Sequence, residues 1–282
     1  MATSFIDLIE EYANNFIDDD TKKRVEQIAA RQTNEFGVDQ FGLDARTLRA
    51  VVPILCWFYH HYFRVETFGA QHIPKGRMMV IANHSGQLPF DGAMIAAAFL
   101  LEAKEPRLLR GMVERWTSEI PFVSTLLPRL GQVVGSPSTC KTLLENEEGV
   151  IVFPEGVKGI SKLFSERYQL TSFGTGFMRI ALAAKAPVVP VALIGAEEQA
   201  PAVANLAPLA KTLGIPALPI IFPQLVPLPL PVKYRIYIGE PIYFNGDGTE
   251  DDDDIAVMVK SVKDTVQQMI KNGLEKRKHI FF

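Results

Sequence analysis

The hydrophobic positions of the first thirty residues recur at helical spacing. Apolar side chains three or four residues apart share one face of a helix, so we expect an amphipathic helix over residues 3–17. The residues of this face are Phe5, Ile9, Tyr12 and Phe16. An acidic run ends this helix, and Asp20 or Thr21 can cap a second helix over residues 22–32.

A third helix, expected over residues 45–63, has an aromatic end. Asp44 is a favourable N-cap, and Pro53 is expected to kink the helix. The aromatic residues of its last turns are Trp57, Phe58, Tyr59, Tyr62 and Phe63. These rings can pack on the protein core, or they can lie in the headgroup layer of a membrane, where rings with polar tips settle. Both interpretations stay open.

Beyond Pro74 the pattern changes to alternating strands and helices. Strands are expected at 78–82, 150–153, 188–194 and 233–238, and helices at 92–103, 174–184 and 255–274. This alternation predicts an α/β fold with a largely parallel sheet flanked by helices, preceded by an N-terminal helical segment. We expect residues 1–64 to form the N-terminal helices, as a membrane-contacting element, and residues 65–282 to form the α/β domain.

Composition and charge narrow the class of protein. The 282 residues are 48% hydrophobic and 22% charged, with a net charge of −3, which is globular and argues against nucleic acid as a partner. No apolar run reaches the 18 residues of a membrane span, and the start lacks the features of a secretory signal. Two distant cysteines favour a reducing compartment. We therefore expect a cytoplasmic protein, peripheral on a membrane.

Three other segments have a structural and a functional interpretation. The Pro-rich stretch 215–232 could be a loop covering the core or a membrane-contacting flap. The tail 275–282, with cations and two aromatic residues, could touch anionic lipid or be frayed. The acidic run 250–254 is interpreted as the start of a helix rather than a metal site.

The first candidate for chemistry lies between an expected strand and an expected helix. His84 stands at the carboxyl end of strand 78–82, where open α/β sheets place their sites. A neutral imidazole there can take a proton from a substrate alcohol, and Asp91 can hold its other ring nitrogen. Two structural interpretations are also open. Asp91 could be only the N-cap of a helix that begins at Gly92, and His84 could be a hydrogen-bonded loop histidine.

The second candidate segment, residues 150–159, again runs from a strand into a turn. Glu155 and Lys158 put a carboxylate and a cation at the strand end, which suits a polar or phosphate-bearing headgroup. Gly156 and Gly159 allow the backbone to approach another segment closely.

These segments, in this order, resemble the glycerolipid acyltransferases. That superfamily includes the lysophospholipid and 1-acylglycerol-3-phosphate acyltransferases. The resemblance covers about residues 65–245 and rests on Asn83-His84 with Asp91, Phe153-Pro-Glu-Gly156, Val188-Val-Pro-Val191 and Ile238-Gly-Glu-Pro-Ile242.

The resemblance implies a transferase of lipid metabolism and phospholipid biosynthesis. His84 would be the general base and Asp91 would orient it, so that a hydroxyl of a lysophospholipid or acylglycerol attacks an acyl thioester. Acyl-CoA or acyl-carrier protein would be the co-substrate, with no metal and no cofactor. Glu155, Gly156 and Lys158 match the block that binds the acceptor, with Lys158 at the position of an arginine.

The sequence departs from the family pattern at two places, which indicates a divergent subgroup. Six residues separate His84 from Asp91, where the family usually has four. The block at 131–136 lacks the arginine that usually helps to bind the acceptor phosphate, and Ser136 or Lys141 could substitute for it. This weakens lysophosphatidate as the acceptor and makes a headgroup-bearing lysophospholipid or an acylglycerol comparably plausible.

Four further arginines and two alternative functions also have to be considered. Arg110, Arg115 and Arg179 are interpreted as solvated, whereas Arg167 is a candidate for contact with substrate. A noncatalytic lipid-binding protein on the same fold is one alternative, because of the altered spacing. An acyl-thioester hydrolase is another, although no Gly-x-Ser-x-Gly elbow supports a serine hydrolase.

Overall fold

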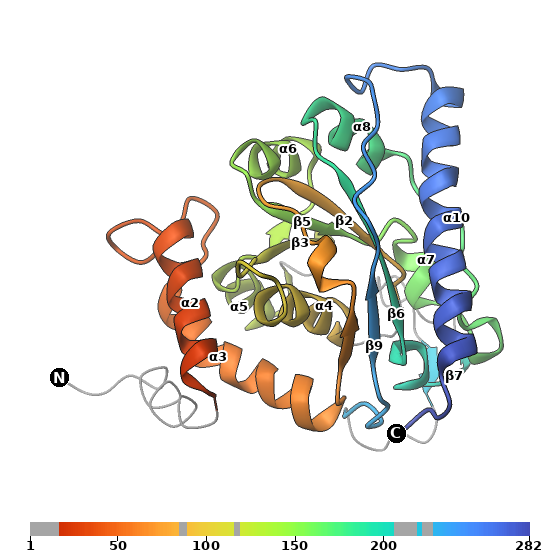
Figure 1. Cartoon of the computed structure of the whole chain (residues 1–282), viewed down its shortest axis with the longest axis horizontal. Coiled ribbons are helices and arrows are strands. Elements are labelled where there is room, and N and C mark those ends of the chain that lie inside the picture. The colour runs from red at the N-terminus through yellow and green to blue at the C-terminus, as the bar shows by residue number, and fades with distance from the viewer. Residues whose placement is uncertain (1–16, 85–88, 116–118, 206–218, 222–227) are drawn as a thin grey trace.

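The computed structural model describes residues 17–84, 89–115, 119–205, 219–221 and 228–282. Within this part of the chain, helices cover both faces of a central seven-stranded sheet (Figure 1). Its order is β1-β9-β6-β2-β5-β3-β4, and the strands are Glu66–Phe68, Arg235–Ile238, Val188–Ile194, Met78–Ala82, Gly149–Val152, Leu109–Val113 and Val133–Val134. A separate two-stranded sheet joins β7, Ala202–Asn205, to β8, Pro219–Ile221.

The central sheet is largely parallel, which confirms the expected fold class. β6, β2, β5, β3 and β4 run in one direction, β9 is antiparallel to β6, and β1 is parallel to β9. We call the side on which the five strands end the carboxyl end of the sheet, and the other side the amino end. β9 begins at the carboxyl end, because Arg235 pairs with Ile194 at the end of β6.

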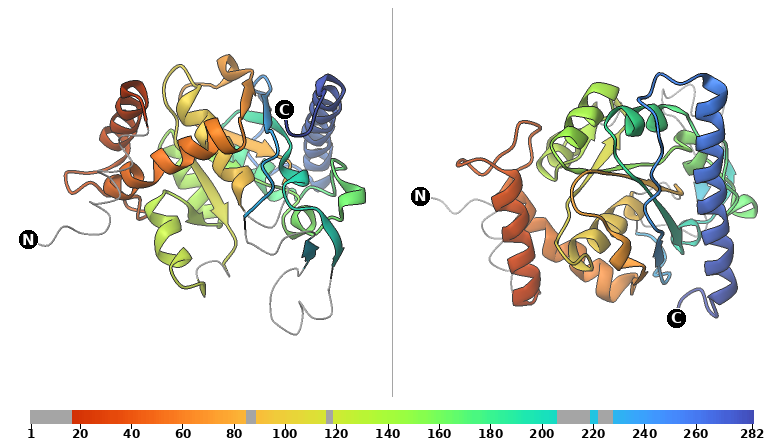
Figure 2. Two further views of the ribbon diagram at one scale, coloured as in Figure 1. Left: turned by 90° about the horizontal axis from the view of Figure 1, so that it is seen from below. Right: turned by 45° about the horizontal axis from the view of Figure 1, so that its top comes forward.

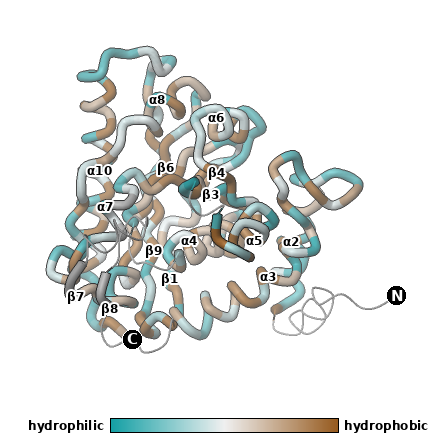
Figure 3. The backbone as a smooth tube through the Cα atoms, turned by 180° about the vertical axis from the view of Figure 1, so that it is seen from behind, coloured by the Kyte–Doolittle hydropathy of each residue, from teal (hydrophilic) through white to brown (hydrophobic). Residues whose placement is uncertain are grey.

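Apolar side chains cover both faces of the central strand. On β2, Val80 and Ala82 lie in a core with α4, whereas Met79 and Ile81 lie in a core with α6, α8 and α10. These helices are Phe90–Leu101, Pro137–Glu145, Gly176–Ala183 and Asp252–Lys276. A strand between two helical layers needs apolar residues at every position, because both of its faces are buried. In Figure 3 the tube of β6, which is the neighbour of β2, has the brown colour of hydrophobic residues.

The N-terminal helices pack against one flank of this domain, opposite α10 (Figure 2). They are α2, Asp19–Gln32, and α3, Ala45–Trp57. Asp44 caps α3 as expected, since its Oδ1 accepts from the Thr47 amide at 2.6 Å. The cap of α2 is Asp18, which accepts from the Thr21 amide at 2.7 Å, so the expectation of Asp20 or Thr21 is wrong. The expected helix over 3–17 lies almost wholly outside the described residues.

The aromatic end of α3 packs in part on the protein core, as one interpretation of its sequence expected, and its contact with a membrane stays a prediction. The helix continues through Pro53 and passes into a π-helical turn, η2, at Phe58–Tyr62. Tyr59 and Phe63 are buried in the main core, whereas Trp57 is 45% exposed. One face of this segment therefore packs on the protein, and another faces outward.

The end of the chain is docked on the sheet. The Lys233 amide donates to the Ile280 carbonyl at 3.0 Å, and Arg235 donates to the Phe282 carbonyl at 3.0 Å. The interpretation of a frayed tail is therefore wrong. In the described part of the chain, no helix is long and apolar enough to cross a bilayer.

Arg110 holds the N-terminal segment to the sheet. It was expected to be solvated, but its side chain is fully buried on β3, because it forms ion pairs with both Asp39 and Glu148. Asp39 lies in the loop between α2 and α3, and Glu148 immediately precedes β5. A buried guanidinium is tolerated here because two carboxylates and a carbonyl receive its hydrogen bonds.

Replacing this arginine tests its importance for stability. Arg110→Met should lower the free energy of unfolding by about 3–5 kcal/mol, because two nearly buried carboxylates lose their cation. Lys141→Met breaks an exposed pair with Glu145 and should cost at most about 1 kcal/mol. Urea denaturation of the two variants measures the difference, and equal losses would contradict this account.

Candidate active site

His84 and Asp91 meet at the carboxyl end of the sheet. His84 follows β2, and Asp91 lies in the first turn of α4. The His84 Nδ1 atom is 2.7 Å from Asp91 Oδ2. The six-residue spacing therefore still brings the two side chains together. Because α4 begins at Phe90, with Pro89 at the N-cap position, the interpretation of Asp91 as only a helix cap is wrong.

The contact determines which ring nitrogen of His84 is free to act as a base. A carboxylate can only accept hydrogen bonds, so Nδ1 carries the proton that is donated to Asp91. In the neutral ring, Nε2 then holds the lone pair. The Asp91 side chain is almost fully buried, and its other oxygen accepts from the Gly92 amide at 2.7 Å. The His84 side chain keeps 20% of its surface exposed, so a substrate can reach it.

The surroundings of His84 raise its basicity. Burial lowers the pKa of His84, but the charge and hydrogen bond of Asp91, together with the charge of Glu155, outweigh burial. The pKa therefore lies above its ordinary value of 6.5. Such a group is a better proton acceptor than a free imidazole once it is neutral.

The Phe-Pro-Glu-Gly segment contacts both the ring and the backbone of His84. The Phe153 ring stacks on the imidazole with 4.4 Å between ring centroids, and Glu155 Oε1 accepts from the His84 amide at 3.1 Å. Gly159, at the start of the next turn, allows close approach, because a Cβ atom there would lie 2.9 Å from the His84 Cβ. The second motif thus fixes both the ring and the backbone of His84.

Glu155 is buried and already bonded within the chain. Its Oε2 accepts from the Thr171 amide at 2.8 Å and lies 3.4 Å from the ammonium group of Lys162. Both of its oxygens are therefore occupied by groups of the protein. Its expected role in binding an acceptor stays a prediction, and its contacts favour a role in positioning His84.

Lys162 is the buried cation of this site, and the sequence reasoning missed it. Its side chain is 6% exposed and lies between Glu155 and Glu197, whose Oε1 is 3.2 Å from the ammonium group. Burial raises the pKa of Glu197, and Lys162 opposes this. A signal was present in the sequence, since only two residues separate Glu197-Glu198 from the fully apolar strand Val188–Ile194. Carboxylates in such a place need buried cations.

The other expected substrate-binding residues lie around the turn. Gly156 adopts a φ of +54°, a conformation that favours glycine, with no neighbouring atom near its missing Cβ. Lys158, on α7 at Val157–Ile160, is exposed and donates to Ser172 Oγ at 3.2 Å. Arg167 stacks on the Phe164 ring, and its Nε is 3.9 Å from Glu198. Their contacts with substrate stay predictions.

The expected substitutes for the missing arginine have other partners. Ser136 caps α6 by accepting from the Thr139 amide at 3.1 Å, and Lys141 pairs with Glu145 on the same helix. Gln132, in the same block, accepts from the Gly111 amide at 2.9 Å. The side chains of Ser136, Lys141 and Gln132 thus bond to other groups of the protein.

A second buried network fixes the chain beyond β6. Glu198 accepts from the Tyr168 hydroxyl at 2.8 Å and from Arg277 at the end of α10 at 2.9 Å. The Asn83 side chain extends β2 beyond its last ladder pair, exchanging two hydrogen bonds with the Leu193 backbone at 2.8 and 3.0 Å. These contacts hold the strand ends on either side of His84.

Comparison with known proteins shows the family of this chain. Residues 64–194 match the acyltransferase family. An uncharacterized protein of Mycobacterium leprae, ML2427, is 38% identical over 263 residues, which cover 89% of this chain and 72% of the relative. The uncharacterized protein Rv0502 of Mycobacterium tuberculosis is also 38% identical, with 89% and 74% covered. The chain belongs to the acyltransferase family.

Two more distant proteins are also similar to this chain. It resembles the chicken "DGAT1/2-independent enzyme synthesizing storage lipids" at 26% identity over 191 residues, which cover 66% of this chain and 54% of that protein. Its fold matches the 1-acyl-sn-glycerophosphate acyltransferase PlsC of Thermotoga maritima, with a TM-score of 0.54. That match covers 96% of this chain and 98% of the other at 18% identity, so it concerns the fold alone.

The link between His84 and Asp91 can be measured by NMR titration of the His84 imidazole. Asp91→Asn should lower the pKa of His84, because burial then opposes only the remaining charge of Glu155. Asp264→Asn removes an exposed carboxylate on α10 and should leave the His84 titration unchanged.

The same raised pKa predicts a pH dependence of stability. The protonated His84 beside Asp91 stabilises the fold fully below pH 6.5, and this contribution is lost as the pH rises through the pKa of the folded protein. An unchanged titration in Asp91→Asn would contradict both expectations.

Proposed function

We propose that this acyltransferase moves a fatty acyl group from the thioester of acyl-CoA or acyl-carrier protein to a hydroxyl of a lipid. The observation that supports this most is the His84–Asp91 pair, because its Nδ1 contact at 2.7 Å leaves Nε2 as the proton acceptor. The family assignment supports the type of reaction.

The reaction follows from this geometry. Nε2 of His84 takes the proton of the acceptor hydroxyl while its oxygen attacks the carbonyl carbon of the thioester. Asp91 stabilises the imidazolium that forms. When the tetrahedral intermediate collapses, the C–S bond breaks and the imidazolium returns the proton to the sulfur. The products are the new ester and a free thiol.

We infer that an acylglycerol is the preferred acceptor. Lys162, whose charge acts on the pKa of His84, is already held by two carboxylates. The block at 131–136 has no arginine for a phosphate. The name of the chicken relative concerns storage lipids, which agrees with a neutral acceptor.

A lysophospholipid is the second candidate, and Lys158 favours it. This lysine is exposed beside the Phe-Pro-Glu-Gly turn, and among the described residues it donates to the neutral Ser172 hydroxyl rather than to a carboxylate. It could therefore pair with a phosphate without first breaking an ion pair.

An acyl-transfer assay with a panel of acceptors tests this proposal. Purified protein, palmitoyl-CoA or palmitoyl-acyl-carrier protein, and each acceptor are incubated while thiol release and acylated product are followed together. We expect product with mono- or diacylglycerol, and less with lysophosphatidylcholine, lysophosphatidylethanolamine or lysophosphatidate. His84→Ala should lower the rate by about 10²–10⁴-fold, because a positioned base is lost. Activity should rise with pH through a value above 6.5, as His84 becomes neutral.

The matched control is His72→Ala. His72 follows β1 at the amino end of the sheet, and its Nδ1 contacts the Ile238 carbonyl at 2.9 Å. Because this place is away from His84, the His72→Ala variant should retain activity. Thiol release that is equally fast without acceptor would indicate a hydrolase. If neither donor gives acylated product or free thiol, the remaining interpretation is a noncatalytic lipid-binding protein.

We also propose that the carboxyl end of the sheet rests on a membrane, with residues 1–64 as the contacting element and the protein cytoplasmic. Trp57 and Leu228 are about half exposed and Phe282 is 81% exposed. Hydrogen bonds join their segments. Tyr62 donates to the Pro229 carbonyl at 2.5 Å, and Arg64 donates to the Phe281 carbonyl at 2.9 Å. Exposed aromatic side chains beside a lipid-processing site favour contact with a membrane.

Vesicle flotation tests the proposed membrane contact. Trp57→Ser with Phe282→Ser should reduce the fraction of protein that floats with phosphatidylcholine–phosphatidylglycerol vesicles, because two exposed rings are removed. Phe36→Ser removes a 79% exposed ring from the loop that contains Asp39, near the amino end, and should leave flotation unchanged. If wild-type protein does not float at any salt concentration, the proposal of a peripheral location is wrong.

A further inference from the structure

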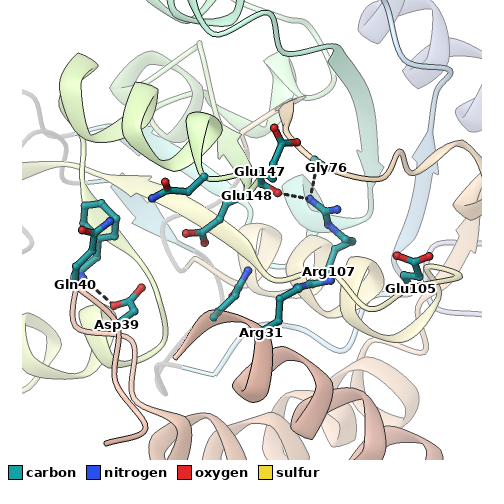
Figure 4. Close-up of a pocket in the computed structure, with 11 residues that line it drawn as sticks. Arg31, Asp39, Gln40, Gly76, Glu105, Arg107, Glu147 and Glu148 are labelled. Atoms are coloured by element: carbon teal, nitrogen blue, oxygen red, sulfur yellow. Dashed lines mark hydrogen bonds between the residues drawn. The ribbon is translucent and has the colours of Figure 1, made fainter. Parts of the chain in front are cut away.

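A cavity of about 540 Å³ lies at the amino end of the sheet, away from His84. It is lined by the last turn of α2 and the loop after it, and by the segments that lead into β2, β3 and β5 (Figure 4). Ligand sites of proteins commonly have volumes of about 300–1,000 Å³, so this cavity is large enough for a nucleotide-sized molecule.

The carboxylates of this cavity are already neutralised from outside it. Glu147 pairs with Arg77, and Glu105 pairs with Lys75 at 2.5 Å. Asp39 and Glu148 share the buried Arg110. None of these three cations belongs to the lining of the cavity. The acidic side chains therefore contribute little uncompensated charge.

The two arginines of the lining have only backbone acceptors. Arg107 is 6% exposed and donates to the carbonyls of Gly76 and Glu147. Arg31 donates to the Pro106 carbonyl at 2.8 Å. Neither has a carboxylate within ion-pair distance in the described part of the chain. Figure 4 shows Arg31 and Arg107 beside each other, with Asp39 and Gln40 across the cavity.

The two arginine charges also repel each other. Burial lowers the pKa of Arg107 and the charge of Arg31 lowers it further, whereas the charges of Glu105, Glu147 and Glu148 act in the opposite direction without overcoming the decrease. A buried cation without a carboxylate partner, next to a second cation, is costly unless an anion is present. An anion between them would remove this cost.

A third group of the cavity lacks a partner in the described structure. The Oε1 atom of Gln32 is buried and accepts no hydrogen bond from the described residues. A ligand that brings a hydrogen-bond donor next to its anionic group would satisfy it. Phosphorylated small molecules with hydroxyl or amino groups have this combination.

We propose that this cavity binds a small phosphate-bearing anion through Arg31 and Arg107, with a donor group of the ligand on Gln32. Arginine suits phosphate because its planar guanidinium group offers paired donors. The exposed side chains proposed to contact the membrane, Trp57, Leu228 and Phe282, lie at the carboxyl end, so the ligand of this cavity comes from solution rather than from the membrane. The site is separate from the acyl-transfer site, and it joins α2 to the sheet.

Isothermal titration calorimetry of the full chain with inorganic phosphate, adenosine 5′-monophosphate and adenosine tests this site. Both phosphate-bearing probes should bind saturably, adenosine should not, and added salt should weaken binding. Tighter binding of the nucleotide than of phosphate would indicate a phosphorylated small molecule, and equal binding would indicate the free anion.

Variants of α2 connect binding to the cavity. Arg31→Gln should weaken binding of the phosphate-bearing probes by about tenfold or more, because a hydrogen bond to a charged group is lost. Lys23→Gln removes an exposed cation from the same helix, outside the cavity, and should not change the affinity. The proposal is wrong if neither probe binds, or if both variants lose affinity equally.

Discussion

The arrangement of the candidate active site depends on the buried carboxylate of Glu155. One of its oxygens holds the backbone of His84 after β2, and the other holds the Thr171 backbone, while Lys162 supplies the opposite charge. The segment that follows β2 and two parts of the long connection that follows β5 are thus joined at a single side chain. A buried carboxylate is stable only with such complete bonding, so loss of any one partner would disturb the other two.

The two family motifs therefore act as one unit. The segment around His84 supplies the base and its orienting Asp91, whereas Phe153, Glu155 and Gly159 supply the surface on which the base rests. The longer loop between His84 and Asp91 is tolerated because its two ends are fixed independently, one by Glu155 and the other by the first turn of α4. The distance between the two side chains is set by the fold rather than by the number of residues in the loop.

The strands and motif residues that could be predicted are those that the neighbouring residues in the sequence identify. β2 and β6 were placed correctly because they are unbroken apolar runs, and His84 and Asp91 were recognised by their order in the motifs. β3 was missed, because Arg110 and Gly111 interrupt its pattern and only distant carboxylates make the arginine acceptable there. Lys162 was missed for the same reason. Its partner Glu197 lies 35 residues away and is brought to it where β6 ends beside the connection after β5, which the sequence around Lys162 does not show.

The pairing of β1 with β9 has a consequence for how the molecule folds. Glu66–Phe68 leaves the N-terminal helices early in the chain, yet its ladder partner is Arg235–Ile238, on the far side of the whole α/β domain in sequence. Contacts between such distant segments form late, since the entropy of closing the intervening loop must first be overcome. On a ribosome, β1 would emerge long before its partner. The aromatic side chains of η2, beside β1, would then stay exposed to solvent until β9 is synthesised. Early binding by a chaperone or a lipid surface would protect this state from aggregation.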